Sequence, residues 1–540
     1  GIGHTRWATH GAPSDINAHP QISKSGRFAV VHNGIIENYA KLKDMLKSEG
    51  YNFVSETDTE VIAHLVEYLY NGDLVDTVIQ VIMRLEGSYA LGVLSADEPD
   101  SFVAVRKDSP LIAGIGEGEN FVASDIPSLI KHTRNIYYLE NDEIVHLTKD
   151  KITVYDLNHK VIDKKVDYVD WDADAAEKGG YEHFMFKEIM EQPKALTNTI
   201  SPRIKDGEIV LDDFHLTKEK IESFRKIYIV ACGSSYHVAC VGKYIIEKMT
   251  RISVEVDIAS EFQYRDPIID EHTLMIVISQ SGTTADTITA MRKAKAQGAH
   301  ILAIVNVIGS VIAKEADDVL YTWAGPEIAV ATTKAYSTQL SVIYLLAIKM
   351  AELTGKISFN ERKTLVKALE ELPQQVEKSM ENLEYIQKTA SQYYNRKNIF
   401  FIGRNLDYAV SMEGSLKLKE ISYIHSEAYA GGELKHGTIS LIEDGTLVVV
   451  LATYAPLVDK IVSNLEEVKA RGASILAVTT EDEKRLDPVS DYIFYVPKTE
   501  EILQPSLTVI PLQLFAYYMA ALNGCSIDKP RNLAKSVTVE

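Results

Sequence analysis

The sequence predicts an α/β protein: a layered α+β domain followed by two doubly wound parallel-sheet modules. Three observations support this prediction. First, the 540 residues exceed the roughly 250 to 300 at which one core stops growing, so several domains are expected. Second, short strand-like runs dominate the segment 1–170, whereas longer apolar runs alternate with helix-like segments from Lys226 onward. Third, these apolar runs recur later in the chain, in the same order and at nearly constant spacing, which indicates a duplicated module.

The segment 1–170 is expected to be mostly β-structure, interrupted by helices. Runs rich in Val, Ile, Tyr and Phe lie between turn signals, as in short strands. Two segments have a helical pattern, and the mixture is typical of a layered α+β domain. The expected strands are 28–32, 89–94, 102–106, 136–139, 144–147 and 152–155, and the expected helices are 38–49 and 58–70.

The two modules are predicted from apolar runs without polar alternation, which are typical of strands buried on both faces of a parallel sheet. A charged helical stretch at 359–394 could bridge the two copies. The expected domains are 1–171, an acidic linker at 172–181, modules at 182–356 and 357–524, and a tail at 525–540. The runs are 227–231, 274–278 and 301–305 in the first copy, matched by 399–402, 447–451 and 475–478 in the second.

Composition excludes several classes of function. The chain is 46% hydrophobic and 24% charged, as in a globular protein. Its net charge of −20 disfavours nucleic acid and anionic lipid as partners. No apolar run is long enough to span a bilayer, so no membrane partner is expected. Three cysteines, Cys232, Cys240 and Cys525, cannot form a disulfide framework, so a cytoplasmic location is expected.

A loop at the end of the second expected strand carries the most informative chemistry. Residues 279–284 read Ser-Gln-Ser-Gly-Thr-Thr, and a helix is expected to follow. In a parallel sheet this position lies at the ligand-binding edge, where a helix N-terminus favours an anion. The loop contains no lysine and no nucleotide P-loop pattern, so a phosphate monoester held without Mg²⁺ is indicated. The alternative is an ordinary helix cap rich in serine and threonine.

The second copy lacks such a loop and carries charged residues instead. Glu413, Lys417 and Glu420 fall on one helical face, where a solvated ion-pair ladder is the alternative interpretation. Glycines flank residues 433–436, so a tight loop presents His436, which could act as an acid or base near neutral pH. A merely solvated histidine is the alternative. The segment after Pro530 has no strong period, which favours a frayed end.

Five separated motifs closely resemble the glutamine–fructose-6-phosphate aminotransferase (isomerising) family, the glucosamine-6-phosphate synthases. The likeness covers essentially the whole chain, and the short linker is similar to that of bacterial members. The resemblance implies an N-terminal-nucleophile glutaminase domain followed by two sugar-isomerase (SIS) modules. It implies fructose 6-phosphate and glutamine as substrates, no metal or organic cofactor, and a homodimer. The motifs are residues 4–11, 31–38, 279–282, 433–437 and 532–540.

In the glutaminase half, the resemblance implies that Arg6 grips the glutamine carboxylate and Asp58 its α-ammonium group. Thr9 and His10 line the same pocket, and Trp7 gates an ammonia passage. The matched oxyanion hole is Asn33 and Gly34, although Asn-Gly is also a strong hairpin-turn signal.

In the isomerase half, the resemblance implies that Glu420 moves a proton between C1 and C2 and that His436 opens the sugar ring. Lys535 forms a Schiff base, so the tail should fold into the active site rather than fray. Burial or a cationic neighbour is expected to keep that amine neutral. The residues matched to the sugar-phosphate site are Ser235, Ser279, Gln280, Ser281, Thr284, Val330, Thr332 and Lys417.

Three departures from the family pattern affect these expectations. Thr283 and Thr332 stand where relatives commonly have Glu and Ser. The family nucleophile is an N-terminal cysteine, which none of the three cysteines matches. The chain begins at Gly1 within a dense motif, so an upstream segment missing from the record is expected, and glutamine hydrolysis would be impossible without it.

Two other functions remain open from the sequence. One is a related phosphosugar isomerase or deglycase, against which the intact glutamine-pocket motifs argue. The other is a non-catalytic sugar-phosphate sensor.

Overall fold

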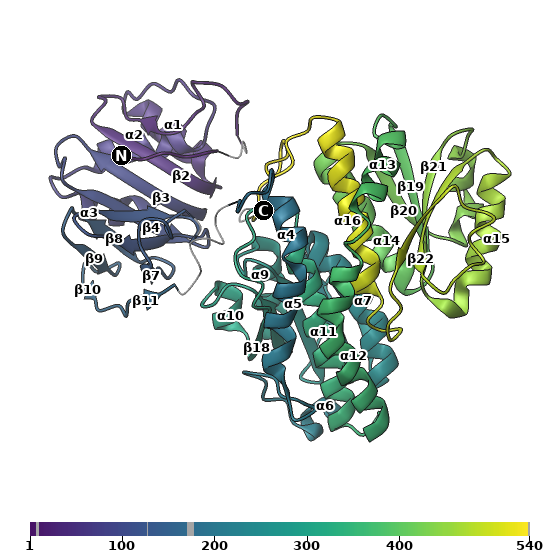
Figure 1. Ribbon diagram of the computed structural model, residues 1–540. Helices are drawn as coiled ribbons and strands as arrows, with labels where there is room; N and C mark the ends of the chain where they lie inside the picture. Colours follow the sequence, from purple (N-terminus) through teal and green to yellow (C-terminus); the bar gives the residue numbers. More distant parts are fainter. Residues whose placement is uncertain (7–9, 127, 170–177, 538–540) are drawn as a thin grey trace. The chain divides into compact units, whose positions relative to one another are not determined.

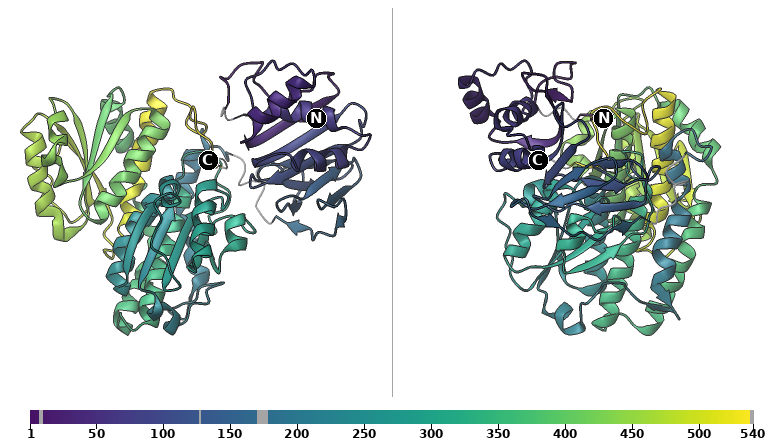
Figure 2. Two further views of the ribbon diagram at one scale, coloured as in Figure 1. Left: turned by 180° about the vertical axis from the view of Figure 1, so that it is seen from behind. Right: turned by 90° about the vertical axis from the view of Figure 1, so that its left-hand side faces the viewer.

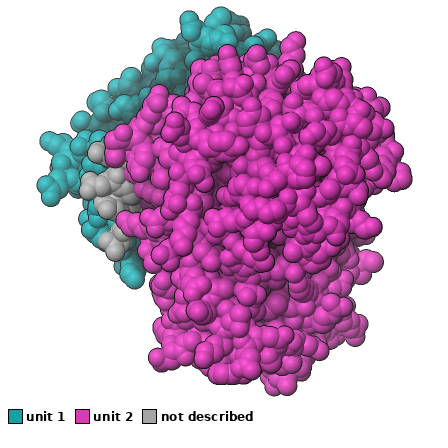
Figure 3. Space-filling model, turned by 45° about the vertical axis from the view of Figure 1, so that its right-hand side comes forward, with its two compact units in different colours: residues 1–176, 283–285, 537–540 teal, residues 177–282, 286–536 magenta. Residues whose placement is uncertain are grey.

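The computed structural model describes residues 1–6, 10–126, 128–169 and 178–537. The first part of the expected linker, 172–177, and the end of the tail, 538–540, lie outside the described residues. The chain divides into two compact units, which Figure 3 distinguishes by colour. The first comprises residues 1–176 with 283–285 and 537–540, and the second comprises 177–282 and 286–536.

The described residues 1–169 of the first unit form two antiparallel sheets and three helices. Every expected strand and both expected helices are present here. Helix α3, Leu74–Ile82, was not expected, although its two unburied residues, Asp76 and Gln80, lie one turn apart. The larger sheet runs β1 (Gln21–Ile22), β2 (Phe28–Ile36), β3 (Gly87–Ser95), β4 (Phe102–Lys107), β8 (Ile144–Leu147), β9 (Ile152–Tyr155) and β10 (Val161–Ile162). The smaller runs β11 (Asp167–Tyr168), β7 (Asn135–Tyr138), β5 (Ile112–Ile115) and β6 (Asn120–Ala123).

The larger sheet of the first unit is buried on both faces. On one face Val30 and Leu91 pack with helices α1 (Tyr39–Ser48), α2 (Thr59–Leu69) and α3. On the other face Ala90 and Ala104 belong to a second cluster with Ala113 of the smaller sheet. The unit therefore has three layers, helices, the larger sheet and the smaller sheet. The end of β2 lies beside the start of α2.

The second unit holds two five-stranded sheets in which every strand pair is parallel. Numbered in chain order within each module, both sheets have strand order 2-1-3-4-5, so the predicted duplication is confirmed. The first sheet runs β15 (Ser253–Ile258), β14 (Lys226–Ala231), β16 (Thr273–Ser279), β17 (His300–Val305) and β18 (Asp318–Tyr321). The second runs β20 (His425–Ala430), β19 (Asn398–Gly403), β21 (Leu447–Ala452), β22 (Ser474–Thr480) and β23 (Tyr492–Val496).

Helices cover both faces of each parallel sheet (Figure 2). Alternate residues of β14 show why the apolar run is continuous: Ile227 and Ile229 enter one core cluster, and Tyr228 and Val230 enter another. The helices of the second unit include α4 (Phe184–Met190), α5 (Gln192–Ile200), α6 (Lys218–Ser223), α7 (Gly233–Thr250), α8 (Ala259–Phe262), α9 (Ala285–Ala296), α10 (Val311–Glu315) and α11 (Lys334–Leu353). They continue with α12 (Phe359–Lys378), α13 (Leu383–Tyr393), α14 (Leu406–Ser422), α15 (Val458–Lys469) and α16 (Pro505–Leu522).

One core cluster joins the two modules. It includes Ile343 of α11, Leu418 of α14 and Leu512 of α16. Helix α16 runs through the second unit (Figure 1). It is the one helix among the described residues long and apolar enough to cross a membrane, and 83% of that stretch is buried inside the fold.

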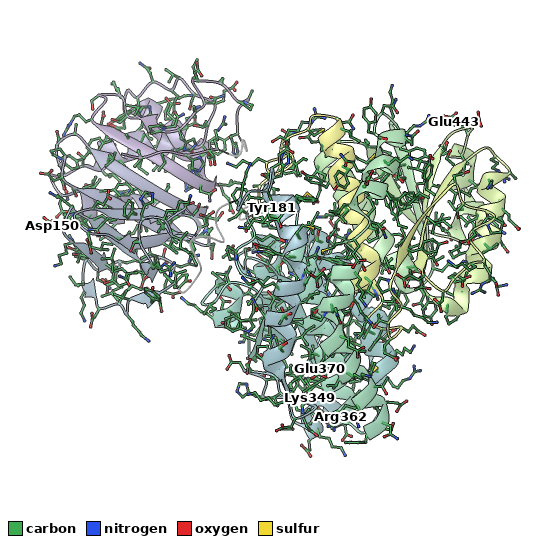
Figure 4. All side chains as sticks on the ribbon, viewed as in Figure 1. Asp150, Tyr181, Lys349, Arg362, Glu370 and Glu443 are labelled. Carbon is green, nitrogen blue, oxygen red and sulfur yellow. The ribbon has the colours of Figure 1, made fainter. Side chains whose placement is uncertain are left out.

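The stretch expected to be helical and to bridge the modules, 359–394, forms the two helices α12 and α13. Helix α12 begins at a capping box formed by Ser358 and Glu361. The guanidinium of Arg362, labelled in Figure 4, forms ion pairs with Glu352 of α11 and, at 2.8 Å, with Glu208. These contacts fix the start of α12 against the first module.

Candidate active sites

The loop predicted to hold phosphate lies at the carboxyl end of β16. In this strand order, β14 lies between β15 and β16, which places the ligand-binding crevice at the ends of β14 and β16. Gly282 has φ +65°, and a Cβ there would lie 2.1 Å from Ser310 Oγ, so the turn requires glycine. Ser279 Oγ accepts the Gly282 N–H at 3.0 Å, which tightens the loop that also carries Gln280 and Ser281.

Ser235 lies in the first turn of α7, directly after β14. Its hydroxyl donates to Gln339 Oε1 of α11 at 3.0 Å, which orients it at the same sheet edge. The neighbouring Ser234 hydroxyl donates to Glu413 of the second module at 2.9 Å. This edge of the first sheet is therefore connected to helix α14.

The carboxyl-terminal tail is anchored first through Asp528, and contacts of Arg531, Lys535 and Ser536 show that a frayed end is wrong for residues 531–537. The carboxylate of Asp528 accepts the N–H groups of Phe184 and Met185 at the start of α4. Its backbone carbonyl accepts the Val330 N–H at 3.0 Å. Further along, Ser536 Oγ lies 2.9 Å from Ser281 Oγ, so the tail reaches the phosphate loop.

Lys535 lies on this anchored tail. Its side chain is 22% exposed, and its Nζ donates to Glu327 Oε2 and, at 3.5 Å, to Thr332 Oγ1. The expectation of a cationic neighbour is wrong, because the partner of Nζ is a fully buried carboxylate.

Two buried carboxyl groups lie next to Lys535. Glu327 Oε1 accepts the N–H groups of Thr333 and Ala335 at 2.9 and 3.0 Å. Burial alone would raise the pKa of Glu327, but the Lys535 ammonium and these hydrogen bonds lower it. Glu188 of α4 accepts the N–H groups of Ile328 and Ala329, and burial together with the charge of Glu327 raises the pKa of Glu188 to about 8.

Lys417 is at the centre of a second buried charged group. Its Nζ lies 3.4 Å from Glu413 and 2.5 Å from Glu420, and it donates to Ser234 Oγ at 3.0 Å. Lys417 and Glu413 are fully buried, so the solvated-ladder interpretation is wrong for them. Burial lowers the pKa of Lys417, but Glu413 and Glu420 outweigh it and the pKa is raised. Glu420 keeps 21% of its side chain exposed and can reach a ligand.

His436 is exposed at the end of a short 3₁₀ turn, Glu433–His436. Its loop is held on its own module, because Lys435 pairs with Glu467 of α15 at 2.6 Å and the Gly431 N–H donates to Gly403 O. No hydrogen bond or ion pair joins His436 to another part of the described chain. The described residues therefore show no contact of His436 with Glu420 or Lys535.

In the first unit, a pocket brings together the predicted glutamine-site residues that the structure describes. Trp7 and Thr9 lie outside the described residues. The pocket is lined by His4, Arg6, His10, His19, His32, Asn33, Gly34, Thr57, Asp58 and Thr59.

Arg6 and Asp58 reach this pocket from different segments. The Arg6 guanidinium donates hydrogen bonds to three backbone carbonyls: His10 O at 2.5 Å, Gly11 O at 3.0 Å and Ala12 O at 3.3 Å. These bonds fix both the Arg6 side chain and the backbone of residues 10–12. Buried Asp58, at the start of α2, accepts the Ile36 N–H at 2.9 Å. This bond orients the carboxylate beside strand β2.

Asn33 and Gly34 lie inside strand β2, paired with Ala90 and Tyr89 of β3, so the hairpin-turn interpretation is wrong. Gly34 has φ +140°, and a Cβ there would lie 2.1 Å from Ser88 O. Glycine is therefore required by close approach of the neighbouring strand.

Four of the residues that line this pocket are histidines: His4, His10, His19 and His32. The rings of His4 and His19 stack with centroids 4.6 Å apart. Burial first, and then unfavourable electrostatic interaction with His4, His32 and Arg6, lowers the pKa of His19 to about 3. Burial also lowers the pKa of His32 to about 4, although Asp58 opposes it. At neutral pH these two rings are uncharged, and Arg6 is left as a cation of the pocket.

Sequence reasoning missed Ser234, His237, Glu188 and Glu327. His237 Nδ1 lies 2.8 Å from Glu413, on the carboxylate that also lies beside Lys417. Glu327 had one available signal: it is the only charged residue between Trp323 and Thr333, in a loop of small and apolar residues. Among the described residues, no cluster of three or more His, Cys, Asp or Glu side chains could hold a metal ion.

Comparison with known proteins assigns the two units to classes. Residues 4–131 match the glutamine amidotransferase domain family, and residues 220–349 and 392–523 both match the SIS domain family. The fold and sites thus define a glutamine amidotransferase domain joined to a pair of sugar-isomerase domains.

Relatives match over the whole chain. Glutamine–fructose-6-phosphate aminotransferases (isomerizing) of Caldanaerobacter subterraneus and Clostridium tetani are 59% and 58% identical over 100% of this chain and 89% of their own lengths. The chain belongs to the glutamine–fructose-6-phosphate aminotransferase (isomerizing) family.

Solved structures match about two thirds of the chain. The C-terminal domain of the Francisella tularensis glucosamine-fructose-6-phosphate aminotransferase is 37% identical, with a TM-score of 0.63, over 65% of this chain and 100% of that one. A Thermotoga maritima glucosamine-6-phosphate deaminase shares the fold at 24% identity, with a TM-score of 0.53, over 66% of this chain and 100% of that one.

Proposed function

We propose that this protein converts fructose 6-phosphate and glutamine to glucosamine 6-phosphate and glutamate. One observation carries the proposal: the anchored tail brings Lys535 and Ser536 to the loops at the carboxyl edge of the first parallel sheet. An amine beside an anion-binding loop is the arrangement that a Schiff base with a phosphorylated ketose requires.

The phosphate group would be held by neutral donors. Ser279, Gln280, Ser281 and Thr284 belong to the loop before α9, and Ser235 is on α7. Hydroxyl and backbone donors at helix starts bind a monoester without a metal ion. Val330 and Thr332 would line the sugar, since their segment contacts both Asp528 and Lys535.

Glu420 is suited to transfer the proton between C1 and C2. Lys417, buried and paired on its other side with Glu413, holds the Glu420 carboxyl group in place. A positioned carboxylate can take a proton from one carbon and return it to the next.

Glutamine would bind in the histidine-lined pocket of the first unit. The Arg6 guanidinium is the cation available to the α-carboxylate, and Asp58 offers a buried carboxylate to the α-ammonium. His10 and Thr9 would contact the same amino acid, Trp7 would gate the passage of ammonia, and Asn33 and Gly34 would stabilise the oxyanion. The family nucleophile is not among the three cysteines of this sequence.

We also propose that the enzyme is a cytoplasmic homodimer and that His436 opens the sugar ring of its partner. Support comes from the exposure of His436 and from the rigid attachment of its loop to α15. Mixing inactive His436→Ala and Lys535→Ala proteins tests this. Random exchange in a symmetric dimer should restore about a quarter of full activity, because each mixed dimer keeps one intact site. No recovery after verified subunit exchange would contradict a shared site.

The test of the main proposal is product analysis. Full-length protein with glutamine and fructose 6-phosphate should yield glucosamine 6-phosphate by mass spectrometry. Glucose 6-phosphate without nitrogen transfer would identify an isomerase, and binding without turnover would identify a sensor. Full synthase activity in Lys535→Ala would refute the Schiff-base role.

A further inference from the structure

We propose that Glu327 is the base that activates Lys535 and the acid that completes Schiff-base formation. This inference rests on the proposed function and adds a catalytic residue to it. Glu327 contacts Nζ, the atom that would react with the sugar carbonyl, and nothing in the sequence motifs marked it.

The two carboxylate oxygens of Glu327 have different partners. Oε1 is occupied by the N–H groups of Thr333 and Ala335 at the start of α11, which fix the carboxyl group. Oε2 contacts Lys535 Nζ. The carboxyl group is completely buried while the lysine is 22% exposed, so the amine has access to a ligand and its base is shielded from water.

The proton has a defined path. Glu327 takes one proton from the Lys535 ammonium, and the freed lone pair forms a bond to the C2 carbonyl carbon of the open-chain ketose. A second proton moves from nitrogen to the former carbonyl oxygen. The C–O bond then breaks, and the hydroxyl leaves as water with the proton held by Glu327. The product iminium keeps one positive charge beside the restored carboxylate, so protons and charge balance.

The surrounding charges make Glu327 rather than Glu188 the ionised group. Glu188 on α4 interacts electrostatically with Glu327, with Lys334 on α11 and with Lys535 on the tail. Lys417 on α14 also interacts electrostatically with Glu327. Lys334 is paired with Glu191 at 2.8 Å. Two adjacent buried carboxylates repel each other, so one stays neutral. Lys535 then faces a single negative charge on Oε2 of Glu327.

The test is reductive trapping of the imine. Full-length protein is incubated with fructose 6-phosphate and borohydride across pH 6.5 to 10, and the rate of adduct formation on Lys535 is followed by intact mass. Wild type should trap at neutral pH. Glu327→Gln should be slower by about 10²-fold at pH 7, the usual worth of a general base, and should accelerate tenfold per pH unit toward the ordinary lysine pKa near 10.4.

Controls separate this role from a structural one. Glu191→Gln, which removes a neighbouring carboxylate that does not contact Lys535, should trap like wild type. Glu327→Asp, which keeps a shorter base, should fall between wild type and Glu327→Gln at pH 7. This intermediate rate keeps the test decisive if Glu327→Gln does not fold.

Three outcomes would overturn the inference. One is equal trapping by Glu327→Gln and wild type at pH 7. A second is a Glu327→Gln rate that stays low at pH 10 while inorganic phosphate still stabilises the variant against heat. The third is no trapping in wild type, which would overturn the proposed function as well.

Discussion

Replacing Glu188 by glutamine should make the second unit more stable than wild type at alkaline pH. Glu188 is 2% exposed and lies beside the charged Glu327. Its pKa is raised from 4.5 to about 8, first by burial and then by Glu327. The folded state therefore holds a proton that the unfolded chain releases near pH 4.5. The stabilisation is fully present below pH 4.5 and is lost as the pH rises through about 8.

The magnitude follows from the size of the shift. Moving the pKa from 4.5 to about 8 corresponds, at about 1.4 kcal/mol per pH unit, to roughly 5 kcal/mol between those limits. Glutamine has the shape of the protonated acid and cannot ionise, so the variant avoids this loss. The entropy of unfolding is about 2.1 cal/mol/K per residue, and the second unit has roughly 360 residues. The Tm of Glu188→Gln should therefore exceed that of wild type by about 6 °C at pH 8.5.

Differential scanning calorimetry of both proteins from pH 5 to 9 measures this difference. The Tm of Glu188→Gln relative to wild type should rise steadily above pH 5. Glu191→Gln is the matched control: its carboxylate pairs with Lys334 and Lys187, so its loss should bring no gain at high pH. Parallel Tm curves for wild type and Glu188→Gln would show that Glu188 is ionised in the fold and would refute the reasoning.

Lys417→Ala should lower the free energy of unfolding by about 3–5 kcal/mol, since it leaves Glu413 buried without its cation. The control Lys367→Ala, on the exposed face of α12, should change the free energy of unfolding little. Equal thermal denaturation midpoints for the two variants would contradict this prediction. Asp58→Asn should raise KM for glutamine by about 10- to 150-fold, the worth of a hydrogen bond to a charged group, and leave ammonia-dependent synthesis intact. Gly34→Ala should lower glutamine hydrolysis by at least about 10²-fold without changing the Tm of the second unit, because Cβ would clash with Ser88 O. Unchanged glutaminase kinetics in either variant would remove that residue from the site.

The fold could be predicted in outline because its strongest signals are local. A strand buried on both faces must be apolar throughout, as in 227–231, and the same pattern at 399–402 revealed the second module. Helix α3 was not predicted, although Asp76 and Gln80 lie one turn apart on one face and the other residues of the helix are buried. The Asn33-Gly34 pair suggested a hairpin turn, and that interpretation was wrong. Glycine is required at position 34 because a neighbouring strand packs closely against it, which the sequence alone does not reveal.

The sequence by itself determined the two modules and the polar loop at 279–284, since each depends on neighbours close in the chain. The residues predicted to bind glutamine lie in separate segments, and only the fold brings Arg6, Asn33 and Asp58 into one pocket. Only the tertiary structure decided how these residues are charged and paired. Lys535 meets Glu327 across 208 residues, and His237 meets Glu413 across 176. Such pairs form only when separate helices and the tail pack together, and burial then fixes which carboxyl groups ionise. Spacing in the chain carries no information about either effect.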